Sequence, residues 1–121
     1  MAVFAIHYDY PDDASEMLKI RPEHREWLSS LPGLLVAGMY QPGRDEATHA
    51  EQGKQGEPGR PLHGMPANGA LIVVSGDSVA EVAATFDHDP YWVAGFVLRR
   101  VVREWNPPLG TWVAEPESLI G

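Results

Sequence analysis

The stretch ALIVVSGDSVAEVAATF, residues 70–86, joins the two kinds of element that decide the fold. Residues 70–75 are a run of apolar, mostly branched side chains, which is typical of a buried strand. Ser78 and Glu81 then have the spacing of a capping box, which marks the start of a helix. The apolar residues that recur on the inner side of this helix are Val82, Ala83 and Phe86. We therefore expect a core strand followed by a helix that packs on its sheet.

The sequence that follows this helix predicts a short second helix and a strand. In HDPYWVAG, residues 88–95, Asp89 is placed to cap free backbone N–H groups, and Pro90 suits the first helical position. Gly95 is expected to end this short helix in the left-handed conformation. Residues 96–103, FVLRRVVR, alternate as a half-exposed strand, with Arg99, Arg100 and Arg103 on a solvated face.

The sequence before residue 70 predicts two strands, a helical region and a long loop. Residues 2–8 and 34–40 are expected to form strands. Residues 14–31 have helical spacing, and Pro22 is expected to divide them, with the second piece beginning near Glu23. The stretch 41–66 is rich in Gly, Pro, Gln and Glu. We expect it to form a long loop that covers a substrate pocket or forms an oligomer contact.

The resulting order is β-α-β-β-α-β, which is the α+β, ferredoxin-like arrangement of an antiparallel four-stranded sheet with helices on one face. Two helices cover only one face, and the strands are too apolar for the other face to stay in water. We therefore expect a homodimer, or a higher homo-oligomer, in which two sheets pack face to face and enclose a cavity.

Composition limits the class of protein and its partners. The chain has 121 residues, 44% hydrophobic and 21% charged, which is typical of one globular domain. A net charge of −8 argues against nucleic acid and against an anionic membrane surface, because both require a basic patch. Cysteine is absent, which excludes thiolate chemistry. The apolar start is too short for a signal or spanning segment, so we expect a cytoplasmic protein.

One pair of residues stands out as a candidate for proton transfer. His24 lies in RPEHREWL, residues 21–28, and Asp89 begins the short helix described above. A carboxylate bonded to one imidazole nitrogen fixes the tautomer and raises the basicity of the other nitrogen. Each residue also has a structural interpretation: Asp89 as a helix cap, and His24 as a partly buried member of the stripe formed with Trp27 and Leu28. Capping and catalysis are compatible for one aspartate.

Metal and phosphate sites are not expected. The other histidines lack the spacing of metal-ligand motifs; they are His7, His49, His63 and His88. The glycines at 53, 56, 59 and 64 do not lie between a strand and a helix, as a phosphate-binding loop requires. The spacing of these residues therefore indicates neither a metal site nor a phosphate-binding loop.

The whole pattern resembles one known family. Its parts are a first strand, the Arg21-Pro22-x-His24 helix start, a strand containing Ala37-Gly38, the Leu-Ile-Val-Val strand, the capped helix, Asp89-Pro90 with a following Ala-Gly, and a strand ending in a Trp. This pattern is similar to the YCII-related (YciI-like) family of dimeric α+β barrels, and the resemblance covers residues 1–106, with a C-terminal tail at 107–121 anchored by Trp112. The loop at 41–66 looks longer than is usual for that family.

The resemblance implies an active site and a type of reaction. It places the family's histidine and aspartate at His24 and Asp89, and the best-understood member eliminates HCl from a chlorinated hydroxyhydroquinone. The resemblance therefore implies a general base that acts, without a metal or organic cofactor, on a phenolic or enolisable small molecule by elimination, isomerisation or tautomerisation. The residues expected to line the substrate pocket are Tyr8, Trp27, Tyr40, Ser75, Phe86, Tyr91 and Trp92. The alternatives are a cofactorless monooxygenase of phenols and a non-catalytic ligand-binding or accessory protein.

Overall fold

The computed structural model describes residues 1–40 and 68–112, and its strands form one antiparallel sheet. The strand order is β2-β3-β1-β4, so the first strand lies in the middle between the third and the fourth. The elements, in chain order, are β1 (Ala2–Asp9), α1 (Ser15–Lys19), α2 (Arg21–Ser29), β2 (Leu34–Met39), β3 (Gly69–Gly76), α3 (Val79–Phe86), α4 (Pro90–Val93) and β4 (Arg99–Glu104). The predicted α+β class and the β-α-β-β-α-β order are confirmed.

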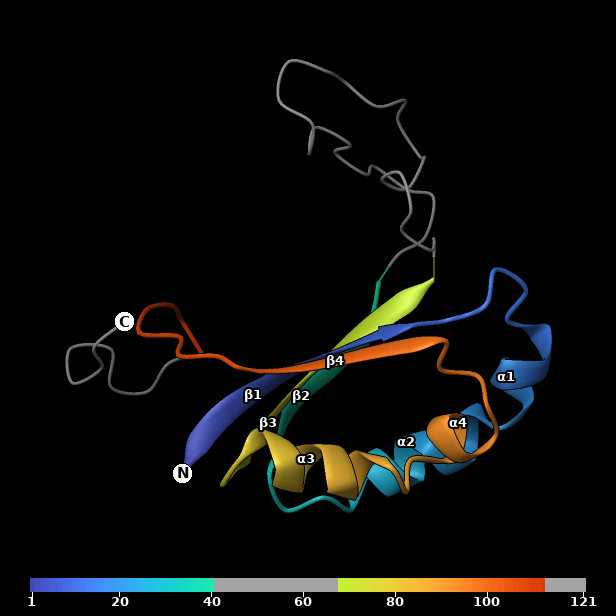
Figure 1. Ribbon diagram of the computed structural model, residues 1–121. Helices are drawn as coiled ribbons and strands as arrows, with labels where there is room; N and C mark the ends of the chain where they lie inside the picture. Colours follow the sequence, from blue (N-terminus) through green and yellow to red (C-terminus); the bar gives the residue numbers. More distant parts are fainter. Residues whose placement is uncertain (41–67, 113–121) are drawn as a thin grey trace.

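All four helices lie on one face of the sheet, as Figure 1 shows. The alternation of side chains along a strand places Phe4, Ile6 and Tyr8 of β1 on this face, and each is at most 1% exposed. The opposing helices contribute Leu28, Val82 and Phe86 to the same apolar cluster. The core therefore lies between β1, β3 and the helical layer, and the functional side chains described below lie at one end of it.

The helical region before β2 is divided at a different residue from the one predicted. The break falls at Ile20, whose amide donates to the Met17 carbonyl, and α2 already begins at Arg21. Pro22 lies in the first turn of α2, where its missing N–H costs nothing because the first helical amides have no partner within the helix. The expected break at Pro22 is therefore wrong by two residues, and this proline starts the helix that carries His24.

The fourth strand begins later than the alternation predicts. Gly95 has φ of 82°, so the expected left-handed end of the short helix is confirmed. The amide of Phe96 then donates to the Tyr91 carbonyl at 3.0 Å, so the chain is still closing the helix end. β4 starts at Arg99, after the amide of Leu98 has bonded to the Asp9 carbonyl. The strand predicted over 96–103 is therefore observed as Arg99–Glu104.

The start of α3 agrees with the capping box. The Ser78 hydroxyl accepts a hydrogen bond from the Glu81 amide at 3.1 Å. The Glu81 carboxylate reaches back to the amide of Asp77, at 3.2 Å, instead of that of Ser78 itself. The amides of Glu81 and Asp77 therefore both have a side-chain acceptor, and these two bonds fix the direction in which the chain leaves β3.

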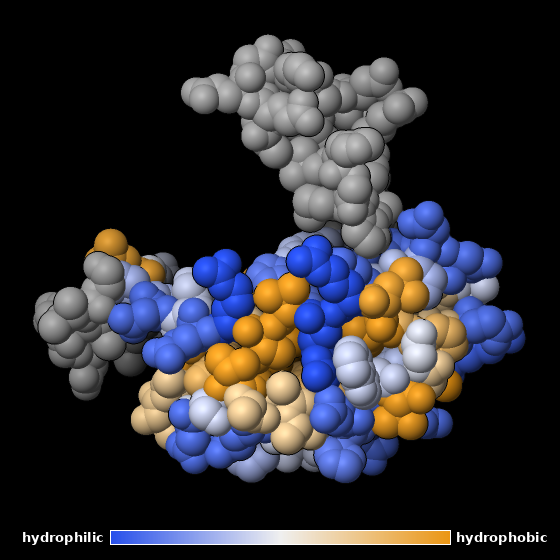
Figure 2. Space-filling view, viewed as in Figure 1, coloured by the Kyte–Doolittle hydropathy of each residue, from blue (hydrophilic) through white to orange (hydrophobic). Residues whose placement is uncertain are grey.

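No helix formed by the described residues covers the other face of the sheet (Figure 1). Exposed apolar side chains of the β2 edge include Leu35, at 56%, and Val36, at 39%. Near the β4 edge, apolar patches alternate with hydrophilic residues in the view of Figure 2. This exposed apolar surface is the feature on which the expectation of a homodimer rests, and the oligomeric state stays a prediction.

Some expectations fall outside the described residues or meet a different environment. The predicted loop at 41–66, with His49 and His63, lies outside them. Trp112, expected to anchor the tail, is 86% exposed, so its ring is not buried as an anchor would be. Within residues 1–40 and 68–112, no helix has both the length and the apolar character needed to cross a membrane.

Candidate active site

Asp89 is the centre of the candidate site. Its side chain is fully buried, and its two oxygens accept three hydrogen bonds. Oδ1 accepts from the backbone amide of Tyr91 at 2.9 Å and from Nδ1 of His24 at 2.7 Å, while Oδ2 accepts from the Tyr8 hydroxyl at 2.7 Å. The carboxylate therefore caps α4 and binds the imidazole at the same time, so the predicted cap is present, and the catalytic role of Asp89 stays a prediction.

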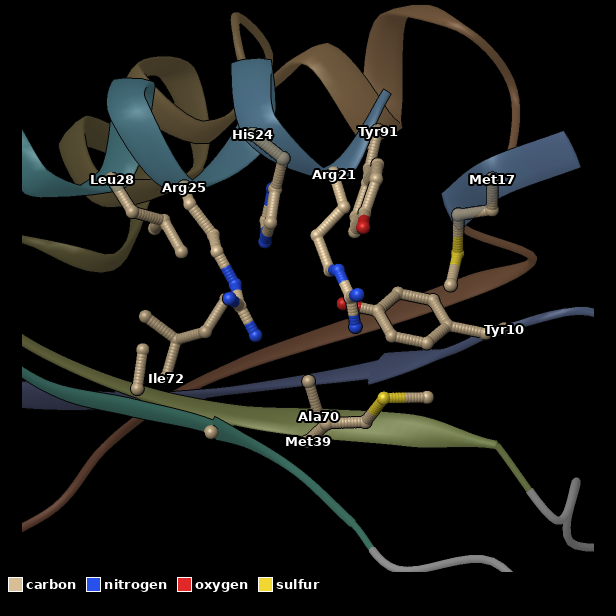
Figure 3. A pocket seen from close by; sticks show the side chains of 12 residues that line it. Tyr10, Met17, Arg21, His24, Arg25, Leu28, Met39, Ala70, Ile72 and Tyr91 are labelled. Atoms are coloured by element: carbon tan, nitrogen blue, oxygen red, sulfur yellow. The ribbon is translucent and has the colours of Figure 1, made fainter. Parts of the chain in front are cut away.

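His24 approaches Asp89 from α2, the helix on the other side of the site. Its ring stacks on Tyr91 with centroids 3.8 Å apart and planes inclined by 10°. The stacking and the bond to Asp89 together fix the orientation of the imidazole. Because a carboxylate oxygen only accepts hydrogen bonds, Nδ1 carries the hydrogen and Nε2 of the neutral ring keeps its lone pair. Figure 3 shows the ring pointing from α2 into a cavity.

Tyr8 supports the carboxylate from the sheet. Burial raises the pKa of its phenol strongly, and the adjacent charge of Asp89 adds to the rise. Burial also raises the pKa of Tyr10, whose ring packs edge-on against Tyr8. Tyr8 therefore remains a hydrogen-bond donor throughout the neutral range. Since its side chain is fully buried behind Asp89, it is placed to hold the carboxylate rather than to touch a ligand.

We expect Tyr8→Phe to lower the free energy of unfolding by about 1.5–3 kcal/mol at neutral pH, because a charged acceptor loses a buried donor. The raised pKa adds a dependence on pH. An unfolded tyrosine ionises near pH 10 while the folded one stays protonated, so this contribution is complete below about pH 10 and is lost as the pH rises further. The gap between wild type and Tyr8→Phe should then narrow by up to about 1.4 kcal/mol per pH unit. Urea titrations from pH 7 to 11 measure it, and a constant gap would contradict the prediction.

The cavity beside His24 lies between α2 and the end of the sheet formed by β2 and β3 (Figure 3). Its volume is about 140 Å³, close to the roughly 150 Å³ of an engineered protein cavity that binds benzene. Its walls are mostly apolar. The lining residues are Tyr10, Met17, Arg21, His24, Arg25, Leu28, Ala37, Gly38, Met39, Ala70, Ile72 and Tyr91. A single six-membered ring is therefore the size of ligand that the cavity suits.

Two functional candidates were missed by the sequence prediction. Arg21 and Arg25 line the cavity from the same helix as His24. Residues 21, 24, 25 and 28 follow the i, i+3, i+4, i+7 spacing of one helical face. The segment RPEHREWL therefore indicates that both arginines share a face with His24. This spacing alone does not distinguish a cavity lining from a solvated face, because arginines on an amphipathic helix usually face the solvent.

Of the residues predicted to line a substrate pocket, Tyr91 alone lines this cavity. Trp27 packs edge-on against Phe86, with ring centroids 5.1 Å apart. Tyr40 is 42% exposed, and its hydroxyl bonds to Nδ1 of His7 at 2.9 Å on the helix-free face. Ser75 lines a second hollow, beside Gly33 and the start of β2, and the contact of these residues with a substrate stays a prediction.

Trp92, which was predicted to line the substrate pocket, lies next to Arg100, which was predicted to lie on a solvated face. The guanidinium of Arg100 lies 3.8 Å from the centre of the Trp92 ring, and it forms an ion pair with Asp87 at 2.9 Å. The side chain of Arg100 is only 12% exposed. The expectation of a solvated face is therefore wrong for Arg100, which shares the helix-covered face with its neighbour Tyr8, while Arg99 and Arg103 are exposed as expected.

The described residues contain no group of three or more His, Cys, Asp or Glu side chains arranged to hold a metal ion. The candidate site consists of the His24 imidazole, the buried Asp89 carboxylate, the Tyr8 phenol and an adjacent cavity of about 140 Å³. Its class is that of a ferredoxin-like α+β domain with an oriented histidine facing a small pocket.

The chain belongs to the YCII-related domain family, whose model matches residues 1–106. Among solved structures it is similar to a 5-chloro-2-hydroxyhydroquinone dehydrochlorinase from Burkholderia phenoliruptrix in complex with 2,5-dihydroxybenzoquinone. That likeness has a TM-score of 0.56 and 19% identity, and it covers 85% of this chain and 92% of the other. At this identity the likeness concerns the fold. No curated protein matches the chain significantly.

Proposed function

We propose that the protein is a small-molecule enzyme in which His24 acts as a general base on a phenolic or enolisable ring compound, without a cofactor. The observation that carries the proposal is the continuous set of hydrogen bonds from Tyr8 to Asp89 to His24, which ends at a cavity of about 140 Å³. A buried carboxylate that orients an imidazole toward a ligand-sized space is the arrangement that proton abstraction requires.

The proposed reaction begins when Nε2 of His24 removes a proton from a ring hydroxyl or from a carbon next to a carbonyl. The electron pair of the broken bond stays in the conjugated ring as an enolate or phenolate. The imidazolium that forms is stabilised by Asp89, whose charge lies 2.7 Å from Nδ1. Return of the proton to a carbon of the ring gives the keto tautomer, which is isomerisation. Where that carbon bears a halide, removal of a second proton from a ring hydroxyl lets the electron pair expel the halide, so the net loss is one hydrogen halide and the reaction is elimination.

The printed name of the structural neighbour supports elimination as the first reaction to test. That protein is a dehydrochlorinase, and its solved structure is a complex with 2,5-dihydroxybenzoquinone. The chain described here belongs to the YCII-related domain family, and its His24 and Asp89 are in contact. We therefore propose halogenated and unhalogenated hydroquinones as the starting panel of substrates.

The test is a screen of this panel with the full-length protein, with and without oxygen. Halide release is measured by ion chromatography, and proton transfer by incorporation of solvent deuterium into the ring. We expect turnover or deuterium exchange that does not require oxygen. Turnover that strictly requires oxygen would favour a cofactorless monooxygenase instead. Ligand binding with neither turnover nor exchange would overturn the enzymatic proposal and favour a binding protein.

A further inference from the structure

Two cations line the cavity, and neither has an acidic partner among residues 1–40 and 68–112. Arg21 and Arg25 extend from α2 toward the sheet, and the His24 ring lies between them in Figure 3. Within the part of the chain that the structure describes, no carboxylate forms an ion pair with either guanidinium. By contrast, Lys19 on α1 and Arg100 on β4 are each paired with a carboxylate. The positive charges of Arg21 and Arg25 therefore line the same cavity as the His24 imidazole, the proposed base.

The cations act on the groups around the cavity. Burial raises the pKa of Tyr91, and the positive charges of Arg21 and Arg25 oppose that rise. Both guanidiniums therefore lie close enough to stabilise a negative oxygen at the position where His24 and Tyr91 meet the cavity. The remaining walls are apolar, and they include Met17, Leu28 and Ile72, so they offer an anion no competing charge.

The overall charge of the protein makes this local arrangement significant. The chain has a net charge of −8, so it repels small anions at a distance, and a neutral substrate would need no cations beside the base. Arginine is the side chain best suited to an anionic oxygen group, because its planar fork matches a carboxylate and is weakly hydrated. Two such forks line the same cavity as the imidazole, and they provide a position for one negative group next to the proton that is removed.

We infer that the ligand of this cavity is a single-ring compound bearing an anionic oxygen group, held between Arg21 and Arg25 beside the His24 ring. The inference rests on the proposed function for the role of His24, but it concerns the substrate class. A carboxylate and an ionised phenol both supply the required chemistry. The cations serve binding, and they also stabilise the negative charge that develops when the proton leaves.

The test compares matched ligands by isothermal titration calorimetry with the full-length protein at neutral pH. Hydroquinone is neutral, 2,5-dihydroxybenzoate adds only a carboxylate, and 2,4-dinitrophenolate carries an ionised oxygen without a carboxylate. We expect at least one of the two anions to bind about tenfold or more tightly than hydroquinone, which corresponds to about 1.4 kcal/mol. Preference for both anions, or for only one, identifies the source of the charge. Equal affinity for all three ligands would overturn the inference.

Variants at the two arginines complete the test. Arg21→Gln and Arg25→Gln should each weaken binding of the anion about tenfold and leave hydroquinone binding unchanged. Lys19→Gln is the matched control, because it removes the same charge from an exposed position outside the cavity and should leave all affinities unchanged. Equal losses for neutral and anionic ligands would overturn the inference.

The outcomes also separate this inference from the proposed function. Anion preference without any turnover or exchange would leave the inference standing and remove the enzymatic role. Turnover of neutral phenols without anion preference would do the reverse.

Discussion

His24→Asn is expected to reduce turnover of a phenolic substrate by about 10²–10⁴-fold, the usual contribution of a positioned general base. The asparagine amide keeps a donor that can face Asp89, but it has no lone pair to accept a proton at the position of Nε2. The loss should fall on kcat more than on KM, because the proton is transferred only in the chemical step. Steady-state kinetics with the substrate found in the screen measure the effect.

The matched control for this variant is His88→Asn. His88 is exposed and follows α3, away from the described cavity lining, so its replacement should leave kcat within about twofold, as expected for a surface substitution. Circular dichroism and thermal unfolding check that both variants remain folded. Retained activity in a folded His24→Asn protein would show that the imidazole is a structural core residue and that a different group removes the proton.

The second large effect is expected from Asp89→Ala, which should lower the free energy of unfolding by at least about 3 kcal/mol. The substitution leaves three donors without their acceptor: the Tyr8 hydroxyl, the His24 Nδ1–H and the Tyr91 amide. Each buried donor without a partner costs about 1–3 kcal/mol, and loss of a helix cap alone costs about 1 kcal/mol. Denaturant titration of the purified variant measures the change.

Asp89→Ser and Asp89→Asn separate the two roles of this residue. Serine is a good helix cap, so Asp89→Ser should recover about 1 kcal/mol of the stability lost in the alanine variant while turnover stays low. Asparagine fills nearly the same volume, but its amide nitrogen must face one of the three donors, so we expect intermediate stability and turnover reduced at least about 100-fold. Wild-type turnover in either variant would show that the carboxylate acts only as a cap.

The fold was predictable because each element has a local cause. The capping box at Ser78 and Glu81 and the Asp89-Pro90 helix start are satisfied by neighbours within a few residues, and their predicted positions agree with the structure. The start of β4 was not predictable in the same way. The residues at 96–98 are apolar enough for a strand, but their amides close the end of α4 and bind Asp9, which are contacts set by the tertiary structure.

The site was predictable only in part, for a related reason. The two sequence segments that contain His24 and Asp89 lie at the starts of two helices. In the structure, Nδ1 of His24 and Oδ1 of Asp89 are 2.7 Å apart. The catalytic role of the pair stays a prediction. The aromatic residues predicted to line a pocket have the right residue type, but residue type does not decide which face of a strand a side chain occupies. Tyr8 and Tyr40 illustrate this, since one is buried under the helices and the other lies on the opposite face.

The contact between His24 and Asp89 joins the two halves of the chain. The imidazole and the Tyr8 donor come from residues 1–40, whereas the carboxylate comes from the turn that follows α3. During synthesis, a nascent chain that has emerged only through β2 carries an imidazole that nothing orients. The complete set of hydrogen bonds around Asp89 can therefore form only after the segment that carries α3 and α4 has been made and has packed against α2 and β1.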